Sequence, residues 1–161
     1  MRRTLGTVVG AVALLCLGIP QANADDNQWD DENLMSREAC QEYPWDSAYK
    51  FHIYYNSVQK GAWRNIGYRV YNFDVLRPGG SNPLTYQLKF CSLPSASTPP
   101  AGSGTRIKNN AASGENTHPK YTAHVYFSSG YKGVQDVMGP YQYIDRFRNV
   151  YNENASFQWT S

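Results

Sequence analysis

The feature that most constrains this chain is a short aromatic and glycine pattern that occurs twice. Residues 54–61 (YYNSVQKG) match residues 126–133 (YFSSGYKG) column by column. Gly61 and Gly133 close the two copies, and glycine adopts a positive φ without steric cost. Each copy therefore predicts a sharply folded β-hairpin, with the ring of Tyr54 or Tyr126 packed over the bare glycine backbone. A unit that recurs in this way predicts two related structural motifs.

A second matched pair follows the hairpins in the same order. Residues 109–113 (NNAAS) are echoed by residues 152–156 (NENAS). The hairpin start and the loop start are 55 residues apart in the first half and 26 apart in the second. The excess contains two stretches rich in Pro, Gly and Ser, residues 78–83 and 92–104, which are typical of surface loops. The first motif thus reads as the second motif with a long loop inserted.

Short apolar and aromatic runs make up most of the chain after residue 40. Runs at 50–55, 68–73, 86–90 and 121–127 are rich in Tyr, Val, Ile and Phe and are bounded by turn residues. No long segment shows the 3.6-residue period of an amphipathic helix. The pattern predicts a single all-β domain over residues 40–161, with about 110 ordered residues, which suffice for one core.

The first 24 residues have the organisation of a secretory signal peptide. Arg2 and Arg3 precede an apolar run over residues 8–19, and Ala22 and Ala24 form a small-x-small cleavage site. The run is too short to span a roughly 30 Å hydrocarbon core as a stable helix, and the chain has no comparable later stretch. Cleavage after Ala24 is expected to give a secreted protein without a membrane anchor.

Cleavage of this segment also changes the charge of the working protein. The signal contains two of the 15 basic residues and none of the 13 acidic ones, which leaves a mature chain near neutrality. A nucleic-acid partner normally requires a basic surface, so none is expected. Residues 25–39 are polar and acidic with few large apolar side chains. This composition predicts a flexible mature N-terminus, with order beginning near Cys40.

Two cysteines remain after cleavage, Cys40 and Cys91. In an exported chain of this size two cysteines pair by default, because the compartment is oxidising. The predicted disulfide closes a loop of about 50 residues, which the chain-entropy model values at roughly 3 to 4 kcal/mol of stability. Cys91 precedes the loop at 92–104, so the bond is expected to tether this loop to the segment before the first strand.

The hairpin residues resemble the Greek-key signature of the βγ-crystallin superfamily, in which an aromatic residue, a second aromatic residue and a glycine recur at fixed spacing. Tyr126, Tyr131 and Gly133 fit all three positions. Tyr54 and Gly61 fit in the first half, where Gln59 stands at the second aromatic position. The resemblance implies a βγ-crystallin-like fold of two Greek-key motifs in one domain.

The two Asn/Ser loops are similar to the calcium signature of the same superfamily. Asparagine, serine and carboxylate oxygens are suitable ligands for a hard cation, and a mostly neutral set implies an affinity of roughly 0.1 to 1 mM. The alternative is that the loops are ordinary turns whose side chains cap the backbone. The residues that the resemblance assigns to calcium are Asn109, Asn110, Ser113, Asn152, Glu153 and Ser156.

The combination of a signal peptide, a disulfide and these motifs over residues 49–159 also resembles small secreted actinobacterial proteins related to the Streptomyces metalloproteinase inhibitor. This resemblance implies a non-enzymatic inhibitor whose partner is an extracellular protease, and the chain is expected to be a monomer. The loop at 92–104 is either the contact with the protease or a passive insertion. The alternative is a calcium-binding extracellular binding module or an antimicrobial, killer-toxin-like module. An enzyme is the third class, but no acid/base pair can be assembled from the sequence.

The histidines and aromatic residues are the remaining candidates for a functional role. His52, His118 and His124 carry no metal or triad signature. His52 and His124 each lie two residues before a hairpin tyrosine, which predicts an equivalent structural position in the two motifs. The many aromatic residues are expected mainly in the core, although Trp63, Tyr68 and Tyr71 are candidates for an exposed sugar-stacking surface.

Overall fold

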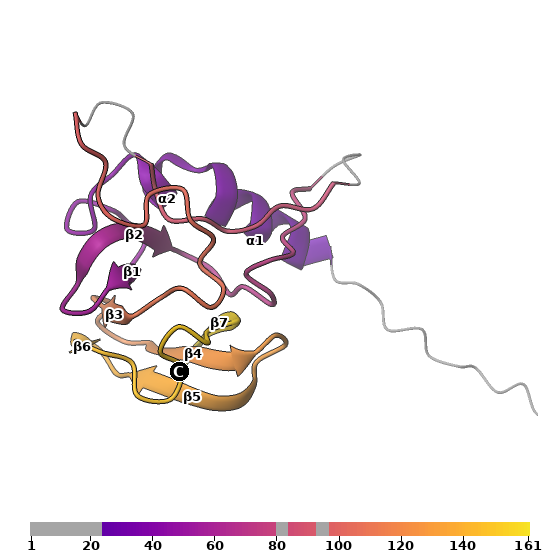
Figure 1. The fold of residues 1–161 in the computed structure, drawn as a ribbon. Coiled ribbons are helices and arrows are strands. Elements are labelled where there is room, and N and C mark those ends of the chain that lie inside the picture. Colours follow the sequence, from indigo (N-terminus) through magenta and orange to yellow (C-terminus); the bar gives the residue numbers. More distant parts are fainter. Residues whose placement is uncertain (1–23, 80–83, 93–96) are drawn as a thin grey trace, which may run out of the picture.

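Two antiparallel β-sheets pack face to face in the computed structural model, which describes residues 24–79, 84–92 and 97–161 (Figure 1). The first sheet has the strand order β2-β1-β3-β6 and the second has the order β5-β4-β7. The strands are β1 (Phe51–Asn56), β2 (Lys60–Ile66), β3 (Ser113–Asn116), β4 (Thr122–Ser128), β5 (Lys132–Met138), β6 (Gln142–Ile144) and β7 (Ser156–Thr160).

Each half of the chain is a Greek key whose third segment crosses to the opposite sheet. In the first half β1 pairs with β2 and β3, whereas Val70 bridges to Phe157 of β7 in the second sheet. In the second half β4 pairs with β5 and β7, whereas β6 pairs with β3 in the first sheet. This reciprocal exchange confirms the predicted all-β, βγ-crystallin-like fold of two Greek-key motifs in one domain.

The core lies between the two sheets. The rings of Phe51 in β1 and Phe157 in β7 stack with their centroids 4.3 Å apart, and both side chains are fully buried. Ile53 and Val125 occupy the corresponding inward positions of β1 and β4 and are also fully buried. Burying apolar side chains of this size stabilises the fold by about 1.5 to 3 kcal/mol each, so this inter-sheet layer dominates its stability.

The inserted part of the first motif contains less regular structure than the sequence suggests. The runs at 68–73 and 86–90 form isolated bridges rather than full strands: Val70 pairs with Phe157, and Leu76 pairs with Tyr86. Phe73 and Leu88 of these runs are nevertheless fully buried. The apolar content of these runs therefore reflects burial against the core and not participation in a long ladder.

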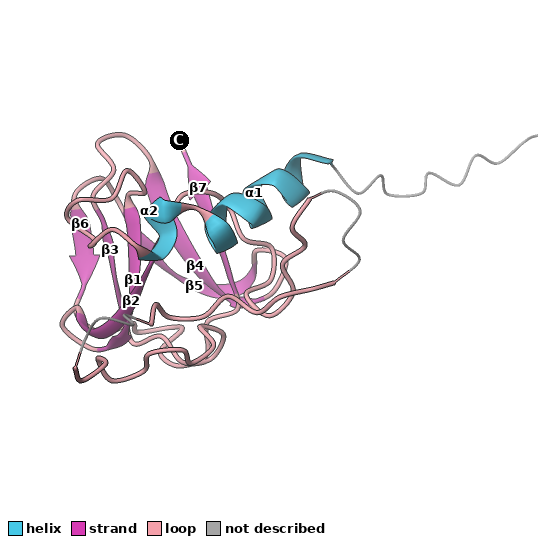
Figure 2. Cartoon of the chain, turned by 90° about the horizontal axis from the view of Figure 1, so that it is seen from above, coloured by secondary structure: helices cyan, strands magenta, loops and turns pink. Residues whose placement is uncertain are grey.

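The N-terminal segment departs from the expected flexible stretch at residues 25–39. It forms two helices, α1 (Ala24–Met35) and α2 (Arg37–Cys40), which lie beside β1 and β2 and away from β4 and β5 (Figures 1 and 2). The predicted cleavage after Ala24 would remove one residue of α1. Residues 1–23, which carry the signal-peptide prediction, lie outside the described residues, so that prediction stays untested.

Hydrogen bonds to residues about 30 positions later in the sequence explain why α1 forms without an apolar stripe. The buried side chain of Asn33 accepts hydrogen bonds from the backbone N–H of Gly67 and Tyr68, and its amide donates to Tyr68 O. The Arg64 guanidinium donates to the backbone carbonyls of Asn33 and Leu34 at the C-terminal end of the helix. A cation placed there satisfies orphan carbonyls and complements the helix dipole.

Within the described residues, no helix combines the length and apolar character needed to cross a membrane.

Candidate functional sites

The two Asn/Ser loops meet each other across the interface between the motifs. The backbone N–H of Asn109 donates to Asn154 O over 2.9 Å, and that of Asn152 donates to Ala111 O over 3.0 Å. The buried Asn154 side chain strengthens the junction, because its Oδ1 accepts from Ala111 N at 3.0 Å. The loops that the resemblance assigns to calcium are thus joined to one another by their backbones.

The predicted serine ligands are engaged in the hairpins. Ser113 Oγ accepts a hydrogen bond from the Gln59 N–H and donates to Asn56 O. Ser156 Oγ does the same in the second motif, with Tyr131 N and Ser128 O. Both hydroxyls are buried and tie the start of β3 or β7 to the neighbouring hairpin.

Asn109 and Glu153 share one hollow on the surface. This cavity of about 340 Å³ is also lined by Ser128, Ser129 and Lys108. The Lys108 ammonium lies 3.7 Å from an Asp74 carboxylate oxygen. Asn110 is directed elsewhere, since its amide donates to Lys108 O. Among the described residues no group of three or more His, Cys, Asp or Glu side chains is arranged to hold a metal ion.

The hairpin glycines adopt the conformation that the repeat predicts. The φ angles are 77° at Gly61 and 82° at Gly133. A Cβ at Gly133 would lie nearest to Phe127 and Ser128, so the tyrosine ring is not the closest neighbour of the missing side chain. The Tyr126 ring instead meets that of Tyr131 edge to face. Its hydroxyl accepts from Gln158, whereas the Tyr54 hydroxyl donates to Glu115.

A disulfide joins Cys40 at the end of α2 to Cys91, as predicted, with a Cα–Cα distance of 5.3 Å. Cys91 N also donates to Trp63 O in β2 over 2.7 Å. The loop that follows is therefore tied to both the helical segment and the first sheet. Residues 93–96 of this loop lie outside the described residues.

The described part of the loop, residues 97–104, returns along the β1–β2 hairpin. Ala101 O accepts from the N–H of Ala62, and Gly104 N donates to Phe90 O. Gly102 has a φ of 89° and lies so close to the Tyr55 ring that a Cβ would overlap it. Two local bonds to Pro100 O, from the N–H and Oγ of Ser103, close the turn. Ser97, Thr98 and Pro99 remain exposed.

His52 and His124 occupy equivalent positions, as the sequence predicts. His52 Nδ1 bonds Asn65 Oδ1 at 2.8 Å, and its Nε2 bonds Thr117 Oγ1. His124 makes the matching bonds to Gln135 Oε1 and Thr160 Oγ1. Burial lowers the pKa of the fully buried His52 to about 4, so that this ring is neutral at physiological pH.

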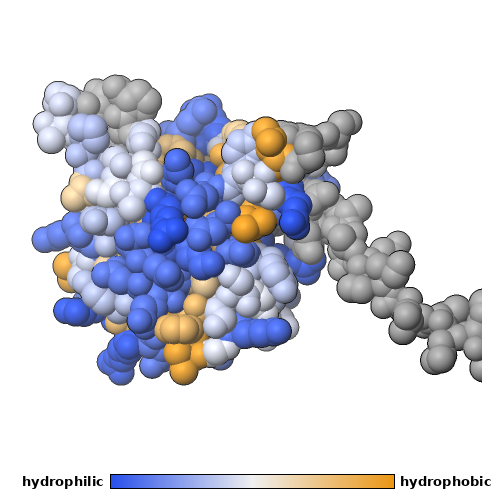
Figure 3. All heavy atoms as spheres, turned by 45° about the vertical axis from the view of Figure 1, so that its right-hand side comes forward, coloured by the Kyte–Doolittle hydropathy of each residue, from blue (hydrophilic) through white to orange (hydrophobic). Residues whose placement is uncertain are grey.

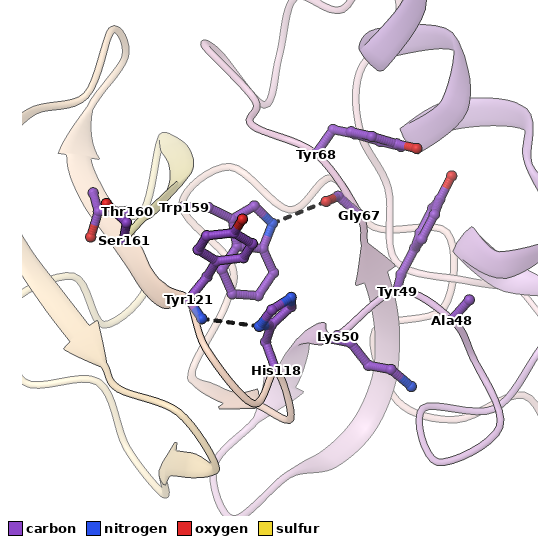
Figure 4. A pocket seen from close by; sticks show the side chains of 10 residues that line it. All are labelled: Ala48, Tyr49, Lys50, Gly67, Tyr68, His118, Tyr121, Trp159, Thr160 and Ser161. Atoms are coloured by element: carbon purple, nitrogen blue, oxygen red, sulfur yellow. Dashed lines mark hydrogen bonds between the residues drawn. The ribbon is translucent and has the colours of Figure 1, made fainter.

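A pocket of about 430 Å³ opens where the two motifs meet (Figure 4). Its floor is Gly67, whose carbonyl accepts a hydrogen bond from Trp159 Nε1 over 3.0 Å. One wall is made by His118, Tyr121 and Trp159, with His118 centred 4.6 Å from the Tyr121 ring and 5.4 Å from the Trp159 ring. Ala48, Lys50, Thr160 and Ser161 complete the lining, and Lys50 lies next to His118.

Tyr49 and Tyr68 form the other wall of this pocket and are held by α1. Their rings meet edge to face at 5.7 Å. The Tyr49 hydroxyl donates to Glu32 Oε2, and burial raises the pKa of this phenol. Trp29 stacks on Tyr68 at 6.1 Å. Because α1 was not expected, sequence reasoning had no basis for assembling this wall, although it singled out Tyr68.

The other two aromatic candidates from the sequence lie apart from this pocket. Trp63 is buried, whereas Tyr71 is exposed and packs edge to face on Tyr131. The face shown in Figure 3 is mainly hydrophilic, and its hydrophobic patches are small and separate. The pocket and the loop at 97–104 are therefore more specific candidate binding sites than a broad apolar surface on that face.

The fold is similar to that of a solved βγ-crystallin structure. A solved structure described as "Evolution of the eye lens beta-gamma-crystallin domain fold" is similar to this chain with a TM-score of 0.46 and 12% identity, over 70% of this chain and 86% of that one. No protein-family model matches the chain, and no curated protein matches it. The βγ-crystallin-like class assigned to the domain is based on its own strand order and strand exchange.

Proposed function

We propose that this chain is a secreted, non-enzymatic protease inhibitor that presents the exposed residues of the 97–104 loop to an extracellular protease. The observation that supports this is the double attachment of the loop. The Cys40–Cys91 disulfide lies just before it, and the Ala101 and Gly104 hydrogen bonds fix its return on the first motif.

The energetic reason is preorganisation. A protease that binds a loose segment must order it, which costs about 0.5 to 1.5 kcal/mol for each immobilised flexible side chain. Pro99 and Pro100 reduce this cost further, since their φ angles are already restricted. The hydrogen bonding of the histidines is consistent with a non-enzymatic role. Both ring nitrogens of His52 and of His124 already form hydrogen bonds to neighbouring side chains.

Inhibition is tested with the mature protein, beginning at Asp25, against a panel of metalloproteases and serine proteases. We expect tight, stoichiometric inhibition of at least one enzyme. Insertion of two glycines between Thr98 and Pro99 should weaken this inhibition at least tenfold by loosening the loop. The matched control is the same insertion after Gly79, which lies in the other inserted surface stretch. Full activity of every protease at micromolar inhibitor would overturn the proposal.

We also propose weak calcium binding at the hollow shared by Asn109 and Glu153. The supporting observation is that the structure brings these two residues, one from each Asn/Ser loop, to the same cavity. Carboxylate and amide oxygens suit calcium, and the presence of Lys108 in the lining lowers the expected affinity. The buried serine hydroxyls already have partners in the hairpins, so Ser113 and Ser156 would contribute mainly by fixing the loops.

Calorimetric titration with calcium tests this second proposal. We expect a dissociation constant of roughly 0.1 to 1 mM. Glu153→Gln removes the carboxylate that the described residues contribute to the cavity and should abolish the heat, whereas Glu115→Gln, outside the cavity, should leave it unchanged. Absence of both binding heat and a rise in melting temperature at millimolar calcium would exclude the site.

A further inference from the structure

The aromatic pocket has the shape of a cup rather than a flat slot. Tyr49 and Tyr68 meet at an interplanar angle of 79°, and the His118 ring is tilted by 56° from Trp159 and by 41° from Tyr121. Parallel faces would favour a flat heterocycle between them. Rings inclined in this way instead surround a three-dimensional ligand with apolar C–H groups on its face.

Apart from Lys50, the polar side chains described in the pocket lining are uncharged hydrogen-bonding groups. His118 Nδ1 accepts from the backbone N–H groups of Lys120 and Tyr121, both at 3.0 Å. In the neutral ring Nε2 therefore carries the proton and acts as a donor. Partial burial and the neighbouring lysines, Lys120 and Lys50, lower the pKa of His118, which keeps the neutral form dominant at pH 7.

The charges of the lining argue against an ionic ligand. Among the described residues that line the pocket, Lys50 is the single charged side chain, and its ammonium already donates to Ser47 O over 2.7 Å. No Asp or Glu is among these described lining residues, so their side chains supply no carboxylate to a small cation. The nearby Glu32 carboxylate is bonded to the Tyr49 hydroxyl. An uncharged ligand with both hydroxyl and C–H surface is the best chemical complement.

We propose that this pocket binds a neutral carbohydrate ring. A pyranose has an apolar C–H face and a rim of hydroxyls, which match inclined aromatic faces and uncharged polar edges. Tyr68 and Tyr121 are each about one-third exposed, at 36% and 37%, so their surface is available to the ligand. The floor and walls are fixed by Asn33, Gly67 and Trp159 through hydrogen bonds, and this preorganisation lowers the cost of binding.

The experiment uses the full mature protein and cellotetraose, whose glucose rings have equatorial hydroxyls and exposed C–H faces. Calorimetry and tryptophan fluorescence are expected to show saturable binding. Tyr121→Ala should weaken it about tenfold, because one wall of the cup is lost. Tyr68→Ala should act in the same direction. Tyr143→Ala is the control, since Tyr143 is exposed on β6 outside the pocket and its loss should not change the affinity.

Three outcomes would overturn the proposal. The first is no saturable signal at cellotetraose concentrations of about 10 mM. The second is equal weakening by the wall variants and the control, with thermal melting used to show that each variant is folded. The third is competition by indole that is tighter than binding of the sugar, which would indicate a site for flat aromatic molecules. None of these readouts depends on protease inhibition.

Discussion

The two Greek-key motifs have the same hairpins but different surroundings. Gln59 and Gly61 in the first motif, and Tyr131 and Gly133 in the second, all adopt positive φ. The serine that follows each hairpin along the chain bonds back to it in the same way. Gln59 takes the backbone conformation of Tyr131 although it is not aromatic, so the hairpin depends on the backbone and on the serine more than on the second ring.

The covering of the two sheets differs. β1 is buried on both faces over its first four residues, because α1, α2 and the insertion pack around the first motif, whereas β4 is partly exposed at alternate positions. The loop at 97–104 belongs to the insertion, and the pocket wall of Tyr49 and Tyr68 is held by Glu32 and Trp29 of α1. The repeated residues thus build the fold, whereas the added segments support the loop and one wall of the aromatic pocket.

Removing the disulfide should give the largest difference between the motifs. Cys40 and Cys91 enclose a sequence separation of 51 residues, and their double replacement by serine is expected to lower the free energy of unfolding by about 3 to 4 kcal/mol. Urea denaturation measures the loss. Hydrogen exchange should accelerate in α2 and at residues 97–104 more than in β4 and β5. Uniform acceleration in both motifs would mean that the added segments stabilise the whole domain.

The buried His52 should make the first motif sensitive to acid. Its folded pKa of about 4 lies below the ordinary value of 6.5, so the unfolded state binds more protons between these values. Stability is therefore complete above pH 6.5 and falls as the pH decreases toward 4. The expected loss between pH 7 and pH 4.5 is about 2 kcal/mol.

The test compares the pH dependence of urea unfolding in the native protein, His52→Gln and His124→Gln. Replacing His52 should remove the loss assigned to this ring, even if it lowers stability at pH 7. His124 is the matched control, because it has the equivalent partners but is only partly buried. An unchanged acid response in His52→Gln would show that carboxylates elsewhere dominate it.

The sequence predicts the parts of this protein that depend on local periodicity and repetition. The paired glycines at 61 and 133, the inserted loop and the equivalence of His52 and His124 follow from the repeat and appear in the structure. The Cys40–Cys91 bond follows from counting cysteines. Each of these inferences uses an internal repeat or a simple count of one residue type.

The remaining features depend on contacts between distant residues. α1 is held by Asn33 and by Arg64, which lies about 30 positions away and has no sequence pattern in common with the helix. The pocket requires Tyr49, Gly67 and Trp159 to meet, and no motif links these positions. The calcium signature identified Asn109 and Glu153 as candidates, but it did not show that the serine hydroxyls belong to the hairpins.

The hairpin serines should have similar effects in the two motifs. Ser113→Ala leaves Gln59 N and Asn56 O without their buried partner, and Ser156→Ala does the same to Tyr131 N and Ser128 O. We expect each variant to lose about 2 kcal/mol of stability, since unsatisfied buried groups cost about 1 to 3 kcal/mol. Thermal and urea unfolding measure both. A loss in only one motif would show that the hairpins are equivalent in shape but not in energetics.

Replacing the hairpin glycines by alanine should give the smallest difference between the motifs. Both variants should be destabilised, and their free energies of unfolding should differ by about 1 kcal/mol. Both positions have positive φ, so both substitutions introduce backbone strain. At Gly61 the new Cβ would also lie 2.9 Å from Ala101 O in the inserted loop, whereas at Gly133 its nearest neighbour, Phe127 Cβ, is 3.4 Å away.

Gly61→Ala should therefore be the less stable variant and should also loosen the loop. Hydrogen exchange at Ala62 would detect this loosening, because the Ala62 N–H donates to Ala101 O. Equal losses would mean that the insertion yields to the added methyl group, and the loop would then be less firmly braced than the inhibitor proposal requires.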